Sequence, residues 1–540
     1  MAGMESRQPV SQIITFWPLV FAAAGFAFSL TQPWSFYSNQ NQYYLHGLAR
    51  AGYGDLATDW LANTADPTPI FSQLIASSYS WVGLWPLNLL FFALGMLAFL
   101  SLMAIGQTLP FWPAQRSAQW LVAGGLTLIF SAIVRCASVG IVGVDYPWYA
   151  QAGIANQYLL GAGLQPSVFG VYLLVSLAAY LHDQPRLAAL AIAVTATMHS
   201  TYLLTGALLV GGYLADLVWR GRSRQAIITG GLALLGVAPI LAYVLSTFRP
   251  SSLGEFREAQ EILAWVRIPH HTRVAQWLDL VAGVQLLAMV AAGYLCRRSR
   301  LAAVLGLPAA GAIALTLIQV LSANATLALL FPWRLSVVLM PLASLVGIII
   351  LGHGIERLLW PGLVRMLAGL CFAVAVLGAV IVDWQGWGYR EYPAESAVMA
   401  YVAEHRLPGE CYLVPTRVPP PPKSRGSYSS TFLPKSGDQT RPSIFEFQRF
   451  RLATGAAIYV DFKSIPYQDR EVLEWWRRVN EVEQWYATPD WEASGVLASV
   501  QLRGITHVVI PRDSPVNCDG WKCLYHDDSY SVYRLPDRRH

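Results

Sequence analysis

About eleven apolar stretches of bilayer-crossing length dominate this sequence and restrict what it can fold into. An α-helix needs about 20 mostly apolar residues to cross a bilayer. Composition agrees, since 55% of the 540 residues are hydrophobic and 13% are charged. We therefore predict a mainly α-helical, polytopic integral membrane protein. The stretches lie near residues 14–32, 81–105, 118–135, 167–181, 187–203, 204–219, 226–247, 278–296, 301–321, 335–352 and 366–383.

Arginines set the predicted orientation of these spans. Cytoplasmic loops of membrane proteins are enriched in Lys and Arg. In this chain the arginines that flank alternate loops are Arg7, Arg116, Arg186, Arg220, Arg222, Arg224, Arg297, Arg298, Arg300, Arg357 and Arg365. We place the N-terminus in the cytoplasm and expect outer loops at 33–79, 136–166 and 248–276.

The composition changes near residue 383 and predicts a domain boundary there. Residues 384–540 contain 19 of the 37 Lys and Arg, 19 of the 32 Asp and Glu, and every lysine. Strand-like CYLVP and HVVIP alternate with helical spacing in AVMAYVAEHR and EVLEWWRRVNEVEQWYA. We therefore predict a transmembrane domain over 1–383 and a soluble extracytoplasmic domain over 384–540, of α/β or α+β class.

Three carboxylates in the first outer loop are candidates for chemistry. Asp55 precedes the helical LATDWLAN, and Asp66 precedes Pro67, so helix N-capping explains both. Asp59 falls inside that short helix, where a carboxylate gains little from capping. Its spacing from Asp55 is equally consistent with a general base and with a solvated charge on the surface.

The second outer loop combines aromatic residues, amides and an acid in GVDYPWYAQAGIANQYLL. Asp145, Tyr146 and Trp148 are therefore candidate sugar-binding residues. The same aromatic residues would also form an interfacial belt at the membrane edge. In the first loop, Tyr44 and His46 are further candidates for substrate binding.

Histidines and arginines near the outer ends of the spans suggest a second kind of site. His199 either belongs to a functional site or is a neutral histidine bonded to a neighbouring helix. Arginine matches phosphate with a rigid fork of donors, so these residues could hold the phosphate of a polyprenyl carrier. Contact with ordinary lipid headgroups explains any single one equally well. The candidates are Arg267, His270, His271, Arg273 and Arg334.

The segment YVDFKSIPYQDREVLEWW is predicted as a strand-to-helix loop in the C-terminal domain. We interpret its Lys463 and Tyr467 as part of an acceptor-binding or lid element over the mouth of an active site. Alternatively, Ser464 or Asp469 merely caps the following helix.

Six stretches resemble a known group of proteins: QYYLHGLA, TDWLANTADPTPIFS, MHSTYLL, FRLATGAAIYVDFKSIPYQDREVLEWWRR, GITHVVIP and YSVYRL. They are similar to an uncharacterised bacterial branch of the GT-C superfamily of polytopic glycosyltransferases. The acidic outer loops, the late outer arginine and the C-terminal domain also resemble that superfamily. The resemblance spans most of the chain. It implies a bacterial inner membrane protein with an extracytoplasmic active site and C-terminal domain.

The superfamily implies sugar transfer from a polyprenyl-phosphate-linked donor to a glycan, lipid or protein acceptor. A first-loop carboxylate serves as the general base, which maps to Asp59, with Asp55 or Asp66 as substitutes. That base takes the proton of the acceptor hydroxyl while arginines stabilise the leaving lipid phosphate. The three acids are spaced by four and seven residues, without an adjacent or Asp-x-Asp pair. We therefore expect no required cofactor, and a divalent metal is not favoured.

Two other function classes remain open. A transporter or flippase of lipid-linked glycans predicts charged span centres, broken helices and internal repeats. A non-catalytic cell-envelope assembly protein would bind a wall polymer and tolerate Asn in place of Asp59. Because the sequence contains no G-x-x-x-x-G-K-[ST] loop, use of a cytoplasmic nucleotide is not expected. We expect membrane lipid but no nucleic acid among the partners.

Overall fold

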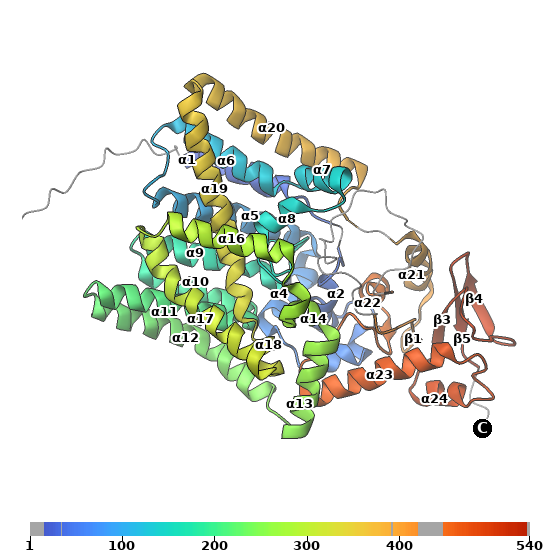
Figure 1. The fold of residues 1–540 in the computed structure, drawn as a ribbon. Helices are drawn as coiled ribbons and strands as arrows, with labels where there is room; N and C mark the ends of the chain where they lie inside the picture. Colours follow the sequence, from blue (N-terminus) through green and yellow to red (C-terminus); the bar gives the residue numbers. More distant parts are fainter. Residues whose placement is uncertain (1–15, 34, 390–391, 420–445, 537–540) are drawn as a thin grey trace, which may run out of the picture.

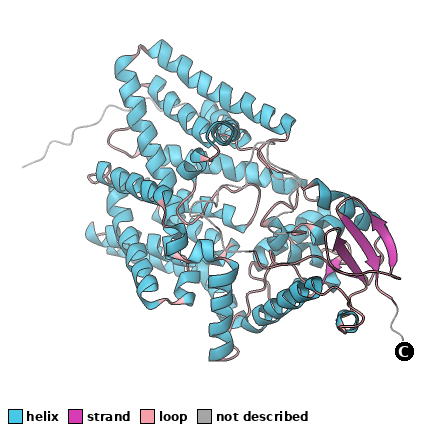
Figure 2. Cartoon of the chain, turned by 45° about the vertical axis from the view of Figure 1, so that its right-hand side comes forward, coloured by secondary structure: helices cyan, strands magenta, loops and turns pink. Residues whose placement is uncertain are grey.

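The computed structural model describes residues 16–33, 35–389, 392–419 and 446–536. Stacked helices form a body on one side, and a small sheet lies at the opposite end (Figures 1 and 2). This arrangement confirms the predicted mainly α-helical class. The long helices of the body are α1 (Phe16–Ser29), α4 (Pro69–Val82), α5 (Trp85–Gln107), α6 (Arg116–Phe130), α7 (Ala132–Val142), α9 (Val171–Leu181), α10 (Pro185–Met198), α11 (Leu203–Trp219), α12 (Ser223–Thr247), α16 (Leu280–Leu295), α17 (Arg300–Ser322), α19 (Ser336–Leu358) and α20 (Pro361–Gln385).

Short helices occupy the connecting segments of the body. Among the described residues they include a π-helix, η5, and five 3-10 helices of three to five residues. These elements are α2 (Gln40–Tyr43), α3 (Leu45–Arg50), η1 (Leu56–Thr58), η2 (Leu61–Asn63), α8 (Tyr146–Gln151), η3 (Pro166–Gly170), η4 (Ser200–Tyr202), α13 (Leu253–Glu261), η5 (Ile262–Arg267), α14 (Pro269–Thr272), α15 (Val274–Trp277), α18 (Ala325–Leu329) and η6 (Pro332–Leu335).

Membrane-length helices make this chain an integral membrane protein. Within the described ranges, six helical segments are long and apolar enough to cross a bilayer, and a seventh span results if α6 and α7, bent by 54° at Ser131, count as one. Four further apolar helices are shorter, at 10–17 residues. Each of the eleven predicted stretches coincides with one of these segments, but the number of spans stays a prediction.

The outer surface of the body is strongly apolar. Trp219, Leu280 and Leu321 are 92%, 84% and 86% exposed on α11, α16 and α17. Such side chains are stable on a membrane protein because lipid covers them. Inside the body, helices approach closely. A Cβ on Gly124 of α6 would lie 2.9 Å from the carbonyl oxygen of Ala368 on α20.

A five-stranded mixed sheet organises the C-terminal part. Its strand order is β2-β1-β3-β5-β4, with β1 parallel to β2 and β3, and β5 antiparallel to β3 and β4. The strands predicted from CYLVP and HVVIP are β1 and β3. The strands are β1 (Cys411–Leu413), β2 (Ala457–Ile458), β3 (His507–Pro511), β4 (Lys522–His526) and β5 (Tyr530–Arg534), and the helices are α21 (Pro393–His405), α22 (Phe450–Thr454), α23 (Asp469–Ala487) and α24 (Val496–Leu502).

Helix α23 joins the sheet to the membrane body (Figure 1). Val472, Trp475 and Val479 are fully buried at helical spacing and pack in the core of the C-terminal part. The side chain of Gln468 caps the helix by accepting a hydrogen bond from the backbone N–H of Glu471. The predicted caps, Ser464 and Asp469, do not fill this role, because Asp469 is already the first helical residue.

The C-terminal part docks onto the segments predicted as outer loops. The side chain of Gln42 accepts from the backbone N–H of Ile465 at 2.8 Å and donates to its carbonyl oxygen at 2.7 Å. Asp469 accepts from the backbone and hydroxyl of Ser251 at 2.6 and 2.7 Å. Loops 33–79 and 248–276 therefore both lie directly against the C-terminal part.

Candidate functional site

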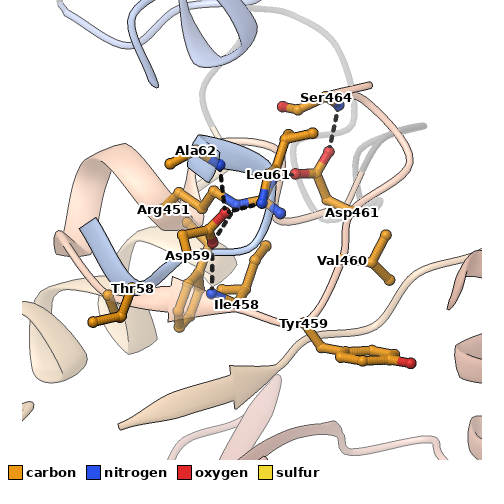
Figure 3. A network of polar contacts seen from close by, with 12 residues as sticks. Thr58, Asp59, Leu61, Ala62, Arg451, Ile458, Tyr459, Val460, Asp461 and Ser464 are labelled. Atoms are coloured by element: carbon orange, nitrogen blue, oxygen red, sulfur yellow. Dashed lines mark hydrogen bonds and ion pairs between the residues drawn. The ribbon is translucent and has the colours of Figure 1, made fainter. Parts of the chain in front are cut away.

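Asp59 lies in a buried hydrogen-bond network between the first loop and the C-terminal part (Figure 3). It is 0% exposed and follows η1, outside any helix interior. One carboxylate oxygen, Oδ1, accepts from the backbone N–H groups of Leu61 and Ala62 at 2.9 and 3.3 Å. The other, Oδ2, accepts from Arg451 Nε at 2.7 Å and the Ile458 N–H at 3.0 Å. The prediction of a solvated surface charge is therefore wrong.

Arg451 connects Asp59 to a second carboxylate, Asp461. The guanidinium is 3% exposed and donates Nη1 to Asp461, whose other oxygen accepts from the Ser464 N–H at 2.6 Å. Burial raises the pKa of Asp461, although Arg451 opposes the shift. Burial also disfavours the charge of Arg451, but Asp59 and Asp461 hold its pKa above the usual value. We call Asp59, Arg451 and Asp461 the clasp.

The other two first-loop acids also bind protein donors. Asp55 makes no capping bond through its side chain and instead accepts from the Gly409 N–H at 2.7 Å. Asp66 accepts from the Thr68 N–H at 2.9 Å and pairs with Arg50 at 2.7 Å. The N-cap of α4 is Thr68, so the capping predictions for Asp55 and Asp66 are wrong in detail.

Three basic residues lie near His271, where the body meets the C-terminal part. Arg267, at the end of η5, donates to the backbone carbonyl of Lys463. Burial, and then Arg267, lower the pKa of Lys463 to about 7. Burial lowers the pKa of the neighbouring His271 to about 3, with Arg334, Lys463 and Arg267 all contributing. Arg267, Arg334 and Lys463 therefore lie within electrostatic range of one imidazole. We call these three residues the cationic cluster.

Neutral groups hold Arg334 in place. Its Nε donates to Gln157 Oε1 at 2.7 Å, and its Nη1 donates to the hydroxyl of Thr201. The guanidinium carbon lies 4.9 Å from the ring centroid of Tyr202 and 5.1 Å from that of Phe331. These contacts orient the cation without neutralising it.

Phenols and an imidazole complete the cluster. The hydroxyls of Tyr43 and Tyr467 are hydrogen-bonded to each other, and both lie in range of Arg267 and Arg334. His199 packs edge-on against Tyr43 with ring centroids 5.7 Å apart. Its Nδ1 is buried and has no hydrogen-bond partner among the residues that the structure describes.

Among the described residues, the clasp and the cationic cluster together contain four basic side chains, Arg267, Arg334, Lys463 and Arg451, and two carboxylates, Asp59 and Asp461, which both bind Arg451. Asp461 also lies in electrostatic range of Arg267 and Lys463. Positive charges that are held close together and partly shielded from water repel one another. This repulsion makes the site less stable without a ligand and favours the binding of an anion. The arrangement can therefore bind a phosphate or another compact anion, with guanidinium groups as donors.

The structure brings together several residues that the sequence assigned to different sites. Lys463, Tyr467 and His199, predicted to bind substrate, lie beside Arg267, Arg334, His270 and His271, predicted to bind a lipid phosphate. Arg451 was not predicted as a site residue. Asp461 lies in the segment predicted as an acceptor-binding or lid element, and Tyr43 lies in the first outer loop, but neither was assigned a specific role.

Other predicted site residues lie outside the cluster. The Tyr44 hydroxyl donates to the Leu164 carbonyl at 3.2 Å, and His46 Nε2 lies 3.2 Å from the Thr64 carbonyl. Arg273 is exposed and lies over the ring of Trp265. These residues have local structural partners.

The second-loop acid Asp145 has a structural role as well. It is 1% exposed, caps α8 by accepting from the Trp148 N–H at 3.1 Å, and pairs with Arg135 at 2.9 Å. Tyr146 is 57% exposed, as expected of an interfacial belt, whereas Trp148 is 5% exposed and points inward. The predicted role of these residues in sugar binding stays a prediction.

No three His, Cys, Asp or Glu side chains converge to hold a metal in the part of the chain that the structure describes. Whether a divalent ion takes part therefore stays a prediction.

Comparison with known families gives one match, to a family described as "Domain of unknown function (DUF6798)", over residues 439–482. This segment contains α22, which supplies Arg451, strand β2, and the following loop, which supplies Asp461, Lys463 and Tyr467. No curated protein matches the chain. The matched segment thus coincides with the part that the C-terminal region contributes to the clasp and the cluster.

Proposed function

We propose that this protein is a glycosyltransferase that moves a sugar from a polyprenyl-phosphate carrier to an acceptor at the membrane surface. The observation that carries the proposal is the cationic cluster, which joins Arg267 and Arg334 of the membrane body to Lys463 of the C-terminal part. A carrier phosphate would sit there, with its isoprenoid chain in the adjoining lipid. The resemblance to GT-C enzymes supports the same reaction.

The cluster would act on the leaving group. When an acceptor hydroxyl attacks the anomeric carbon, its proton would pass to a first-loop carboxylate, for which Asp59 is the predicted base, the bond between that carbon and the phosphate oxygen breaks, and negative charge develops on the lipid phosphate. Fixed cations at that oxygen stabilise the transition state more than the ground state. Because Arg334 is held by neutral partners, its full charge is available for this role.

The position of the cluster suits a lipid-borne donor. Arg267 and His271 precede α16, whose outward face carries Leu280, Leu287 and Val290 at 84%, 70% and 69% exposure. A carrier tail lying along such a face would remain in hydrocarbon while its phosphate reaches the cluster. We further propose that the cluster and the C-terminal part face the extracytoplasmic side, as the arginine distribution predicts.

The test is transfer by the purified full-length protein in nanodiscs. It would be supplied with a panel of polyprenyl-phosphate and polyprenyl-diphosphate sugars, together with lipid and glycan acceptors. Release of bare carrier that depends on acceptor, and is inhibited by added polyprenyl phosphate, would support the proposal. Movement of intact donor across the bilayer without bond cleavage would instead identify a flippase, and binding without either outcome would identify an assembly protein.

Anion binding should weaken as pH rises through the pKa of Lys463. Because that pKa is about 7, the side chain is cationic below this pH and neutral above it. If binding requires the protonated amine, affinity for farnesyl phosphate falls by up to about tenfold per pH unit above 7. The measurement is a titration by calorimetry between pH 7 and 9, where the charge of the phosphate, whose second pKa is about 6, is constant.

Two variants isolate the contribution of Lys463. Lys463→Arg keeps the charge throughout this range, so binding should be strong and flat with pH. Lys463→Met should bind weakly and also show no pH step. An unchanged pH profile in Lys463→Met would assign the titration to another group.

A further inference from the structure

A cleft lies at one edge of the C-terminal sheet, where the parallel strands β1 and β3 end. Residues 415–417 and 511–515, at and after the ends of these strands, line it together with the start of α21, part of α23 and the turn before β5. The cleft has a volume of about 580 Å³. Small-molecule sites usually measure roughly 300–1,000 Å³, so the cleft is large enough to hold a ligand.

The order of the strands explains why a cleft lies here. β1 is parallel to its neighbours β2 and β3, so the carboxyl ends of all three lie at the same edge. The chain leaves β1 toward β2 on one side and leaves β3 toward β4 and β5 on the other. Helices cover both faces, since Leu413 of β1 packs with α23 and Tyr412 packs with α21. In such sheets, ligands bind outside the carboxyl ends of neighbouring strands whose connections diverge.

The cleft lies beside the loop that contributes to the clasp and the cationic cluster. Asp461, Lys463 and Tyr467 follow β2, so this loop begins at the same edge of the sheet. Thr416, which lines the cleft, donates its hydroxyl to the backbone carbonyl of Val460 at 3.2 Å, and Val460 directly precedes Asp461. A ligand in the cleft and a phosphate at the cluster would therefore contact neighbouring segments of the chain.

The residues that line the cleft match a ligand that has both hydrogen-bond donors and acceptors. Carboxylates only accept hydrogen bonds, and guanidinium groups only donate them. Sugar hydroxyls do both, whereas a phosphate dianion only accepts and a hydrocarbon does neither. The acids that line the cleft are Glu395, Glu446, Glu483, Asp513 and Asp528, and the basic residues are Arg417 and Arg512.

The surroundings of Glu446 disfavour an anion in the cleft. Its Oε1 accepts from the hydroxyl of Tyr530 at 2.7 Å. Burial raises the pKa of Glu446, the Tyr530 hydrogen bond and Arg417 oppose this shift, and Asp513 adds to it. A further negative charge beside Glu446 is therefore unfavourable. The phosphate of a lipid carrier fits the cationic cluster and not the cleft.

We propose that this cleft binds the acceptor, as a hydroxyl-rich glycan without negative charge, while the cationic cluster binds the phosphate of the donor. The role of the glycan as acceptor rests on the proposed function. The binding of a glycan rests on the cleft alone.

Saturation-transfer NMR with the full-length protein in nanodiscs tests glycan binding. The probes are the neutral oligosaccharides maltotetraose, cellotetraose and N-acetylchitotetraose, and the anionic tetragalacturonate. At least one neutral probe should receive saturation from the protein, and tetragalacturonate should not. Glu483→Ala and Asp513→Ala should each weaken binding of that neutral probe about three- to tenfold. Ser514→Trp, which places a large ring at the wall of the cleft, should abolish its signal.

Glu492→Ala and Asp519→Ala are the matched controls. Both residues are exposed acids of the C-terminal part, like Glu483 and Asp513, but they do not line the cleft. Their replacement should leave glycan binding unchanged. Equal losses in control and cleft variants, saturation of tetragalacturonate, or no saturation of any neutral probe would overturn the proposal. Thermal unfolding of each variant shows whether it is folded, and if Ser514→Trp is not, the two alanine variants decide.

The outcome is separable from that of the transfer assay. Glycan binding that is sensitive to Asp513→Ala, without turnover of any lipid-linked donor, would retain the cleft as a glycan site and reject the transferase. Transfer to a glycan acceptor with the same kcat/KM in folded Ser514→Trp, Asp513→Ala and native protein would retain the transferase and reject the cleft as its acceptor site.

Discussion

Replacing Arg451 with methionine should destabilise the protein by about 3–5 kcal/mol and loosen the C-terminal part from the body. The substitution removes the guanidinium that bonds to both Asp59 and Asp461, which are 0% and 2% exposed. Two buried carboxylates would then lose the cation that they bind, and breaking a buried ion pair in this way costs far more than the intact pair contributes. We expect a lower thermal unfolding midpoint and faster proteolytic release of the C-terminal part.

The control for this variant is Arg470→Met. Arg470 lies on α23 in the same part of the chain, but its side chain is 67% exposed and lies 3.4 Å from Glu255. Exposed ion pairs contribute roughly 0–1 kcal/mol, so the unfolding midpoint should hardly change. Equal stability of the two variants would mean that the clasp does not hold the C-terminal part in place.

A companion variant, Asp59→Asn, separates the clasp from the proposed role of Asp59 as general base. An amide has one accepting oxygen, so it cannot satisfy both pairs of donors that the carboxylate binds. If Asp59 only secures the clasp, the variant loses stability but keeps transfer at temperatures at which it remains folded. If Asp59 is also the base, the clasp opens during turnover, and the variant loses transfer even where it remains folded.

The apolar pattern was enough to predict the membrane body. Six of the eleven predicted stretches coincide with helical segments long enough to cross a bilayer, because about 20 apolar residues in sequence favour a bilayer-spanning helix. Four others coincide with shorter apolar helices, and 118–135 coincides with the bent pair α6 and α7. The break at Ser131 was not predicted, since 118–135 reads as one continuous run. Local pattern likewise identified β1, β3 and α23, whose hydrophobic faces are evident without tertiary information.

The site could be predicted only in part, because its contacts join distant residues. Arg451 is 392 positions from Asp59 in the sequence, so an isolated Asp59 in a polar loop gave no sign of a buried partner. Arg267 and Lys463 were recognised as candidates for separate roles, but their 196-residue separation concealed that they meet. The residue types predicted binding of a phosphate. Only the folded structure shows that Arg267, Arg334 and Lys463 lie near one another.

Arg267→Gln and Arg334→Gln should each lower kcat/KM for the lipid-linked donor by about 10²–10³-fold. Glutamine keeps hydrogen-bonding capacity but removes the positive charge that opposes the developing charge on the leaving phosphate, and losing one such preorganised group costs this much in other enzymes. Arg267→Lys should recover part of the rate, because charge remains while the planar fork is lost. Initial rates with the donor selected from the panel give these values.

Arg273→Gln is the matched control for the charge, since Arg273 lies in the same loop, is exposed and stacks over Trp265 outside the cluster. Its rate should change less than about twofold if only clustered cations act on the phosphate. Affinity for farnesyl phosphate gives a second readout that needs no knowledge of the sugar, and it should fall in Arg267→Gln and Arg334→Gln only. If all three variants lose the same activity, the arginines act through the general surface charge, and the cluster is not the site of the leaving phosphate.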